Sequence, residues 1–227
     1  MPNINRRNWL AASGAALVTG GLTTTARAGA PCGEGPRAAV SARERIQRRH
    51  FPNLPLVTHE GREVRFYDDL VKDKIVLLNM MYAKCDGICM PTTMNLVKVQ
   101  KLLREHYGAR FGREIVMYSI TLKPEQDSAE VLRKYAITHG AGPGWLFLTG
   151  KPDDIEQLRR AQGYVDLDPE IDKARISHTG NVRYGNEART IWSACPGLSK
   201  PAAIAEAISW VDWPKSGPGT AAKGEVK

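Results

Sequence analysis

Two cysteines lie close together near the middle of the chain, in the segment Cys85-Asp86-Gly87-Ile88-Cys89. Neighbouring thiolates either oxidise to a disulfide or bind a soft metal ion. Thioredoxin-type redox motifs separate their cysteines by two residues, whereas three separate these, which weakens a redox interpretation without excluding it. A zinc site needs four ligands, whereas two thiolates and one imidazole suit Cu(I), which accepts a low coordination number. The structural alternative is a pair of inert buried cysteines.

The segments around the cysteine pair predict what positions it. Continuous apolar runs at residues 75–81, 115–120 and 145–148 are typical of strands buried on both faces of a sheet. The pair follows the first run and precedes a helical pattern, and active groups of open α/β sheets gather at such strand ends. If both cysteines lie in the first turn of that helix, their i, i+4 spacing places both sulfurs on one side. The free N–H groups of that turn favour thiolate.

Further helices and a late hairpin complete the predicted domain. Helical patterns occupy residues 41–49, 91–107, 127–135, 152–158 and 201–211. Ser41 is expected to cap the first of these helices, and Asp127 with Glu130 to form a capping box on the third. Residues 176–184 and 188–194 are typical of a hairpin around Gly185-Asn186. Strands that alternate with helices, followed by a hairpin and a helix, predict an α/β sandwich.

The first 28 residues are predicted to be an export signal. Arg6 and Arg7 precede a weakly apolar stretch at residues 9–22, and the segment ends in Ala26-Arg27-Ala28. This order is typical of bacterial twin-arginine signals with a small-x-small cleavage site, and it predicts a periplasmic protein. An uncleaved membrane anchor and an amphipathic N-terminal helix are the alternatives.

Length and charge limit the class of protein. The chain has 227 residues, 42% of them hydrophobic, and a net charge of +8, which suits one domain of ordinary size. We expect a signal at 1–28, a linker with a short helix at 29–53, a folded domain at 54–213 and a disordered tail at 214–227. Loss of the signal removes three arginines and no acid, which lowers the net charge to +5. This modest positive charge does not indicate nucleic-acid binding. Its densest cluster, the arginines of residues 43–49, contains no aromatic residues of the kind that stack on bases.

Several segments, taken together, resemble the SCO/SenC family of copper-handling, thioredoxin-like proteins over residues 54–210. The segments that carry the resemblance are residues 61–70, the strand at 74–82, Cys85-x-x-x-Cys89, residues 118–127 with Leu132, Tyr135 and Ala136, residues 144–150, and His178. The resemblance implies a thioredoxin-like sandwich, with a central mixed sheet and flanking helices.

The resemblance also implies a function and a ligand set. Members of the family bind Cu(I) or Cu(II) through two thiolates and a histidine, which here would be Cys85, Cys89 and His178. They help to build the dinuclear copper centre of cytochrome c oxidase, or act as thiol reductants for it. The expected partners are therefore a copper-accepting oxidase subunit, or another copper enzyme, and a thiol reductant.

Three departures from the family pattern alter the surroundings of the cysteines. Asp86 stands where the family has proline, Met90 displaces a second proline by one position, and Lys123 stands where aspartate is common. These changes leave the ligands intact but bear on which protein accepts the copper. Four methionines, Met80, Met81, Met90 and Met94, could offer soft sulfur, although Met80 and Met81 are expected in the core of the first buried strand.

Two enzyme functions compete with copper transfer. A thiol–disulfide oxidoreductase would cycle Cys85 and Cys89, but it needs no histidine at position 178. It would also be expected to have a cis-proline before its late strand, where Ser177-His178 stands. A peroxiredoxin-type peroxidase would place threonine or serine three residues before its cysteine, where Tyr82 stands. Transfer and oxidoreduction are compatible, because a disulfide must be reduced before its thiolates can bind metal.

Cys195 is a candidate auxiliary thiol. With a two-residue turn at Gly185-Asn186, His178 would face Ser193, and Cys195 would be its diagonal neighbour on the same face. A four-residue turn would pair His178 with Cys195 directly, and a three-residue turn would send Cys195 to the opposite face. The alternative is a small buried residue at the end of a strand.

Overall fold

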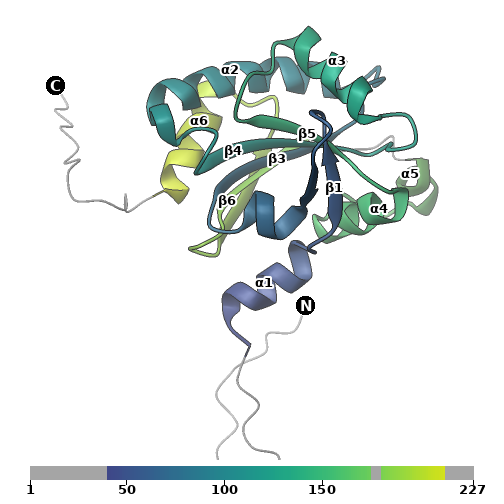
Figure 1. Cartoon of the computed structure of the whole chain (residues 1–227), viewed down its shortest axis with the longest axis horizontal. Helices are drawn as coiled ribbons and strands as arrows, with labels where there is room; N and C mark the ends of the chain where they lie inside the picture. The colour runs from purple at the N-terminus through teal and green to yellow at the C-terminus, as the bar shows by residue number, and fades with distance from the viewer. Residues whose placement is uncertain (1–39, 175–179, 213–227) are drawn as a thin grey trace, which may run out of the picture. The chain divides into compact units, whose positions relative to one another are not determined.

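The computed structural model of the chain describes residues 40–174 and 180–212. These residues contain a seven-stranded mixed sheet in the order β2-β1-β5-β4-β3-β6-β7 (Figure 1). The strands are β1 (Pro55–Thr58), β2 (Glu63–Arg65), β3 (Ile75–Met81), β4 (Ile115–Thr121), β5 (Trp145–Thr149), β6 (Asn181–Asn186) and β7 (Ile191–Pro196). The central strands β3, β4 and β5 are parallel, and every other neighbouring pair is antiparallel.

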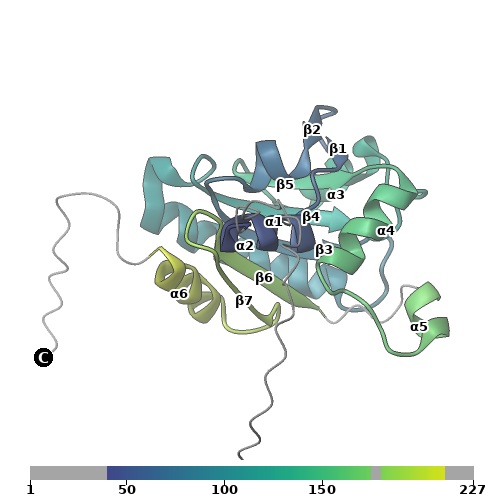
Figure 2. The ribbon, with the colours of Figure 1, turned by 90° about the horizontal axis from the view of Figure 1, so that it is seen from below.

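Helices cover both faces of the sheet. They are α1 (Ala42–His50), the π-helix η1 (Phe66–Val71), α2 (Cys89–Tyr107), the 3-10 turn η2 (Gly108–Arg110), α3 (Ala129–His139), α4 (Pro152–Ala161), α5 (Pro169–Ala174) and α6 (Pro201–Val211). Helices α2, α3 and α6 lie on one face, and α1, η1 and α4 lie on the other (Figures 1 and 2). The mixed α/β sandwich predicted from the sequence is therefore confirmed.

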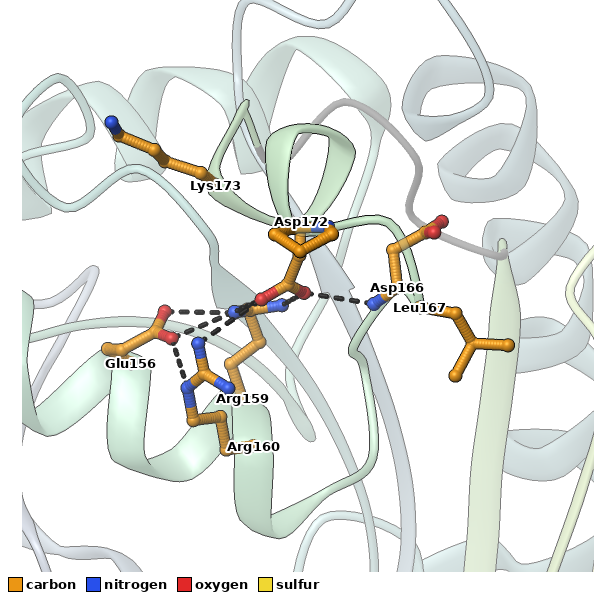
Figure 3. A pocket seen from close by; sticks show the side chains of 8 residues that line it. Glu156, Arg159, Arg160, Asp166, Leu167, Asp172 and Lys173 are labelled. Atoms are coloured by element: carbon orange, nitrogen blue, oxygen red, sulfur yellow. Dashed lines mark hydrogen bonds and ion pairs between the residues drawn. The ribbon is translucent and has the colours of Figure 1, made fainter.

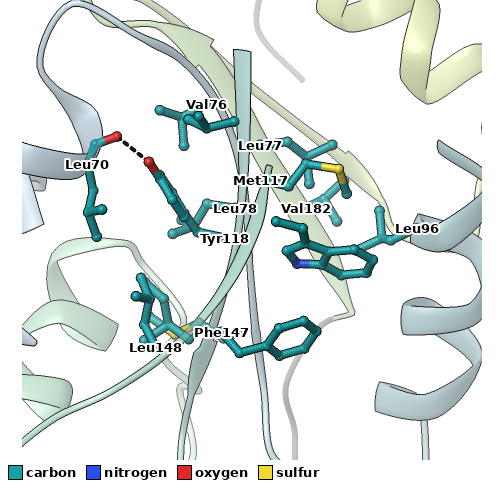
Figure 4. Packing of buried hydrophobic residues seen from close by; sticks show 14 of the residues in the cluster. Leu70, Val76, Leu77, Leu78, Leu96, Met117, Tyr118, Phe147, Leu148 and Val182 are labelled. Atoms are coloured by element: carbon teal, nitrogen blue, oxygen red, sulfur yellow. Dashed lines mark hydrogen bonds between the residues drawn. The ribbon is translucent and has the colours of Figure 1, made fainter. Parts of the chain in front are cut away.

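The three continuous apolar runs form the middle of the sheet, as predicted. Every residue of β3 and β4 is buried, because each strand has a neighbour on both sides and helices on both faces. Figure 4 shows Leu96 of α2 packed near Met117 of β4 and Val182 of β6. On the opposite face, the Tyr118 hydroxyl donates a hydrogen bond to the Leu70 carbonyl of η1 at 2.8 Å.

The late hairpin turns at residues 187–190, so the predicted turn at Gly185-Asn186 is wrong. Val182 faces Cys195, and Tyr184 faces Ser193. The predicted pairing of His178 with Ser193, and the alternative pairing of His178 with Cys195 across a four-residue turn, are therefore also wrong. His178 itself lies outside the described residues.

Gly185 belongs to the strand because it allows close packing. A Cβ atom at this position would lie 2.4 Å from the Ile191 carbonyl oxygen and 2.4 Å from the Trp192 ring. Neither contact is possible for a side chain, so only glycine allows the Trp192 ring to approach β6 this closely. The Trp192 ring then packs on Phe51, with their ring centroids 4.2 Å apart.

The predicted cap of α3 is shifted by one residue. Ser128, rather than Asp127, is the N-cap, and its hydroxyl accepts a hydrogen bond from the Val131 N–H. Asp127 points instead into the interior, with 1% of its surface exposed. The predicted cap of α1 is confirmed, because the Ser41 hydroxyl accepts a hydrogen bond from the Glu44 N–H at 3.1 Å.

Helix α1 is tied to the domain by its first basic residue. Arg43 makes hydrogen-bonded ion pairs with Asp73 at 2.6 Å and with the buried Glu187 at 2.5 Å. The Tyr67 hydroxyl donates a further hydrogen bond to Glu187 at 2.8 Å. The arginines of residues 43–49 therefore have different roles. Arg43 binds carboxylates of the domain, whereas Arg48 is exposed and pairs with Glu44 of its own helix.

No helix within the described ranges is long and apolar enough to cross a lipid bilayer. The predicted export signal (1–28) and the predicted tail (214–227) lie outside the described residues.

Candidate metal centre

The cysteine pair lies at the carboxyl end of β3, where the chain enters α2. Cys89 is the first residue of α2, and Cys85 lies in the preceding loop. The condition under which i, i+4 spacing would place both sulfurs on one side, with both cysteines in the first helical turn, is therefore not met. Their side chains are nevertheless hydrogen-bonded to each other, because the loop folds Cys85 back over the start of the helix.

The surroundings of Cys85 favour its thiolate. Partial burial alone would raise the pKa of this thiol. Hydrogen bonds from the Cys89 side chain, from the N–H groups of Cys89 and Gly87, and from the Tyr82 hydroxyl outweigh burial and lower the pKa below its ordinary value. Cys85 is also partly exposed, so the more acidic sulfur is the one that solvent and reagents can reach.

Cys89 has the opposite character. Only 2% of its surface is exposed. Burial, together with the hydrogen bond to Cys85, raises the pKa of its thiol far above the ordinary value, against a backbone hydrogen bond at Tyr82 that lowers it. A partly exposed thiol with a lowered pKa thus contacts a buried thiol with a raised pKa. Two sulfurs in contact are the geometry that both a disulfide and a soft-metal site require.

Tyr82 and Lys123 form one wall beside Cys85. Burial and the hydrogen bond to Cys85 raise the pKa of Tyr82 to about 12, so its hydroxyl remains a donor. The Lys123 ammonium lies 4.3 Å from the centroid of the Tyr82 ring, within the range of a cation–π interaction. Lys123 therefore places a positive charge over the ring of Tyr82, whose hydroxyl is hydrogen-bonded to Cys85.

Asp127 ties together the two strand ends that carry the site. Its Oδ2 atom accepts hydrogen bonds from the Ala83 N–H at 3.0 Å and from the Thr121 hydroxyl at 2.6 Å. Ala83 is in the cysteine loop and Thr121 ends β4, so one buried carboxylate fixes the loop to the sheet. Sequence reasoning missed this role, although a carboxylate that follows β4 at the active edge of a parallel sheet is a signal that could have revealed it.

Within residues 40–174 and 180–212, no three His, Cys, Asp or Glu side chains are grouped closely enough to hold an ion. The described chain resumes at Gly180, where a Cβ atom would lie 2.3 Å from Cδ1 of Ile88. Gly180 is thus packed against the residue that precedes Cys89.

Cys195 lies on the sheet face that carries α2 and α6. It faces Val182 across the hairpin, and Val182 faces Asn79 of β3. Two strand spacings place its Cα atom about 10 Å from that of Asn79. Cys195 is partly buried, and burial raises the pKa of its thiol. Its role as an auxiliary thiol stays a prediction.

The methionines near the site are either buried or exposed, and two of the histidines pack against other parts of the domain. Met80 and Met81 are buried in β3, as predicted, whereas Met90 and Met94 are 54% and 48% exposed. The His59 Nδ1 atom accepts a hydrogen bond from the Phe147 N–H at 3.1 Å, which is a structural role. The His139 ring packs 4.1 Å from that of Tyr135.

A second polar cluster holds the segment that leads toward position 178. The Arg159 guanidinium, 5% exposed, bonds to Asp172 at 2.6 Å and to Glu156 at 2.8 Å (Figure 3). These contacts line a hollow of about 390 Å³ and fix α5 against α4. Arg159 holds the pKa of the Asp172 carboxyl well below its usual range.

The comparison with protein families identifies the chain. The SCO1/SenC family model matches residues 44–211. The chain belongs to this family. A SCO2-like protein of Rickettsia prowazekii is 34% identical over 116 residues, which cover 45% of this chain and 60% of that protein. A SCO1 homolog of Bacillus subtilis is 26% identical over 101 residues, or 44% of this chain and 49% of that protein. The chain thus spans about half the length of these curated relatives.

Solved structures confirm the predicted thioredoxin-like fold. Bradyrhizobium japonicum ScoI with copper bound superposes with a TM-score of 0.54 and 18% identity, over 69% of this chain and 96% of that one. BsSco, in which a disulfide switch was identified, is a member of the Sco family of cytochrome c oxidase assembly proteins. It superposes with a TM-score of 0.56 and 20% identity, over 70% of this chain and 90% of that one.

Proposed function

We propose that the chain binds copper as its cargo and delivers it during assembly of a copper centre such as that of cytochrome c oxidase. The thiolates of Cys85 and Cys89 and the imidazole of His178 would be the ligands. The observation that carries the proposal is the contact between the two cysteine side chains at the entrance to α2. A soft ion bound there would replace the thiol–thiol hydrogen bond by two metal–sulfur bonds.

The relatives support copper as the cargo. ScoI of Bradyrhizobium japonicum has been solved with copper bound, and BsSco belongs to the cytochrome c oxidase assembly proteins. His178 is also close enough to the described site along the chain to supply a third ligand. His178 is two residues before Gly180, a separation of at most about 7 Å between Cα atoms, and Gly180 packs on Ile88 beside Cys89.

A thiol–disulfide oxidoreductase is the second candidate, and a specific observation favours it. The partly exposed thiol of Cys85 is the more acidic, and the buried thiol of Cys89 is the less acidic. This asymmetry suits a thiolate that attacks a substrate disulfide and a second thiol that then resolves the mixed disulfide. Both functions use the same two sulfurs, and only the reduced pair can bind copper.

We also propose that residues 1–28 direct the chain to the periplasm through twin-arginine export. Arg6 and Arg7 before a weakly apolar stretch support this route. If the signal is not cleaved, it would anchor the protein to the membrane. Replacing both arginines by lysine should leave the full-length chain in the cytoplasm, and a processed form in the periplasm would contradict the assignment.

The copper proposal is tested by titrating the reduced chain with Cu(I) against a coloured chelator, without oxygen. One ion should bind per chain. Cys85→Ser or Cys89→Ser should each weaken binding by more than about 100-fold, since each removes a thiolate from a site with few ligands. His178→Ala should weaken binding and speed copper loss, and Cys195→Ser is the matched control that should keep the stoichiometry.

Activity toward a substrate disulfide separates the two candidates. A chain that binds one copper ion tightly and reduces disulfides slowly is a transfer protein, whereas rapid reduction without copper binding identifies an oxidoreductase. Unchanged copper affinity in Cys85→Ser or Cys89→Ser would falsify the assigned site.

A further inference from the structure

The methionines of the described chain fall into two sharply different groups. Met80, Met81 and Met117 are in the core, with 3%, 0% and 0% of their surface exposed. Met90 and Met94 are 54% and 48% exposed, and both belong to the first two turns of α2. Among the exposed large apolar side chains of the described residues, Met90 and Met94 alone carry sulfur, and both lie within five residues of Cys89.

Helical geometry places the two thioethers on one face. Met90 and Met94 are four residues apart, and such residues are neighbours with their Cβ atoms about 5–6 Å apart. The buried face of α2 is made by other positions, beginning with Cys89, Thr92 and Thr93, so the pair faces outward. Each methionine has three rotatable bonds, which let the two sulfurs converge on a single ion.

We propose that Met90 and Met94 form a second, weaker Cu(I) site that receives the ion and passes it to Cys85 and Cys89. This inference rests on the proposed copper function. Thioether sulfur is a soft, uncharged ligand that selects Cu(I). No oxidation or reduction takes place: Cu(I) exchanges two bonds to thioether sulfur for two bonds to thiolate sulfur, and any proton still held by the cysteine thiols is released to solvent.

The electrostatics of α2 set the direction of transfer. The positive end of a helix dipole and the exposed Lys98, one turn beyond Met94, both disfavour a bound cation. The first turn of α2 contains no acidic residue to offset them. The methionine site therefore binds more weakly than a pair of thiolates, which carry formal negative charge. Met90 directly follows Cys89 in the chain, and the ion would enter the stronger site at Cys85, the partly exposed member of the pair.

The methionine site is tested with the thiols removed, in the full chain carrying serine at all four cysteine positions and ¹³C-methyl methionine. Ag(I), a soft monovalent ion that does not change oxidation state, is the probe. The methyl resonances of Met90 and Met94 should shift together to saturation, while those of Met80, Met81 and Met117 stay fixed and report an intact core. Met94→Leu keeps the volume and removes the sulfur, so it should weaken binding at least about tenfold, because the second contact of a chelate is lost.

The second arm measures how fast copper reaches the intact cysteine pair from a weak Cu(I) chelate. Met90→Leu with Met94→Leu should slow loading severalfold and leave the final stoichiometry unchanged. Silver shifts that survive Met94→Leu, or an unchanged loading rate in the double variant, overturn the proposal. The latter outcome points instead to an apolar docking face, which leucine preserves. If the cysteine pair binds no copper while the silver shifts persist, the proposed function and the transfer step both fail, and only metal binding by Met90 and Met94 is upheld.

Discussion

Asp127 offers a test of how the cysteine loop is held. It is 1% exposed, and its Oδ2 atom accepts hydrogen bonds from the Ala83 N–H and the Thr121 hydroxyl. Asp127→Ala leaves both donors without this acceptor. An unsatisfied buried donor costs about 1–3 kcal/mol. Thr121 is fully buried, whereas Ala83 is partly exposed and can reach water, so the two losses together should lower the free energy of unfolding by about 2–4 kcal/mol.

Two neighbouring variants control this measurement. Asp127→Asn keeps a carbonyl oxygen as acceptor and loses only the charge, so it should cost about 1 kcal/mol. Ser128→Ala removes the N-cap of α3, a loss of typically about 1 kcal/mol. It leaves the hydrogen bonds of Asp127 to Ala83 and Thr121 intact. Urea unfolding of all three, with equal slopes, gives the ranking.

Hydrogen exchange at one amide distinguishes loss of the Asp127 hydrogen bonds from a general loss of stability. The Ala83 amide should exchange its hydrogen faster in Asp127→Ala than in Ser128→Ala, because only the first variant releases the cysteine loop. If Asp127→Ala costs no more than Ser128→Ala, or if the Ala83 amide exchanges equally fast in both, then the carboxylate does not hold the loop.

Three further outcomes follow from the structure. Gly185→Ala should destabilise the chain by at least about 1–3 kcal/mol in urea unfolding, because its Cβ would overlap the Ile191 carbonyl oxygen and the Trp192 ring. Asp172→Asn should cost about 2–3 kcal/mol at pH 7 by the same assay, since it leaves the buried Arg159 with one carboxylate partner fewer. The pKa of Asp172 is lowered in the folded chain, so its contribution is complete above the unfolded pKa of about 3.9 and is lost as the pH falls further. The gap between wild type and Asp172→Asn should therefore narrow on going from pH 7 to pH 3, and a gap that widens would contradict the ion pair. Cys195→Ser should change the alkylation rate of the reduced chain while the urea midpoint stays close to that of the wild type, and a collapse of the midpoint would show that Cys195 is a core residue instead.

The sheet was predictable where local pattern and tertiary environment agree. Strands β3, β4 and β5 lie between other strands and beneath two helical layers, so nearly all of their residues are apolar. Helices α4 and α6 begin with a proline in the first turn, which is a local signal that needs no tertiary contact.

The errors arise where tertiary contacts override a local preference. Gly185-Asn186 has the composition of a tight turn, yet Trp192 packs across the glycine, and the Asn186 amide donates to the Val211 carbonyl of α6 at 3.1 Å. Asp127 has the composition of a helix cap, yet the distant Ala83 N–H is its partner. The two hydrogen bonds join residues 44 and 25 positions apart, so no short window of sequence contains both partners.

The site was predictable in its residues but not in its asymmetry. The spacing of Cys85 and Cys89 indicated two cooperating sulfurs, and the structure brings them into contact. Their opposite pKa shifts depend on the burial of Cys89 and on donors such as the Gly87 N–H and the Tyr82 hydroxyl, which the fold of the loop supplies.

The position of β3 in the sheet has a consequence for how the chain is made. One neighbour of β3 is β4, but the other is β6, and Ile75 pairs with Asn186 far along the chain. Synthesis proceeds from the N-terminus, so the two cysteines leave the ribosome long before the strand that flanks them exists. Pairings of high sequence separation are also slow to form. The thiols of a nascent chain therefore experience the redox conditions of the compartment in which synthesis occurs, and a reducing one keeps them available for the folded site.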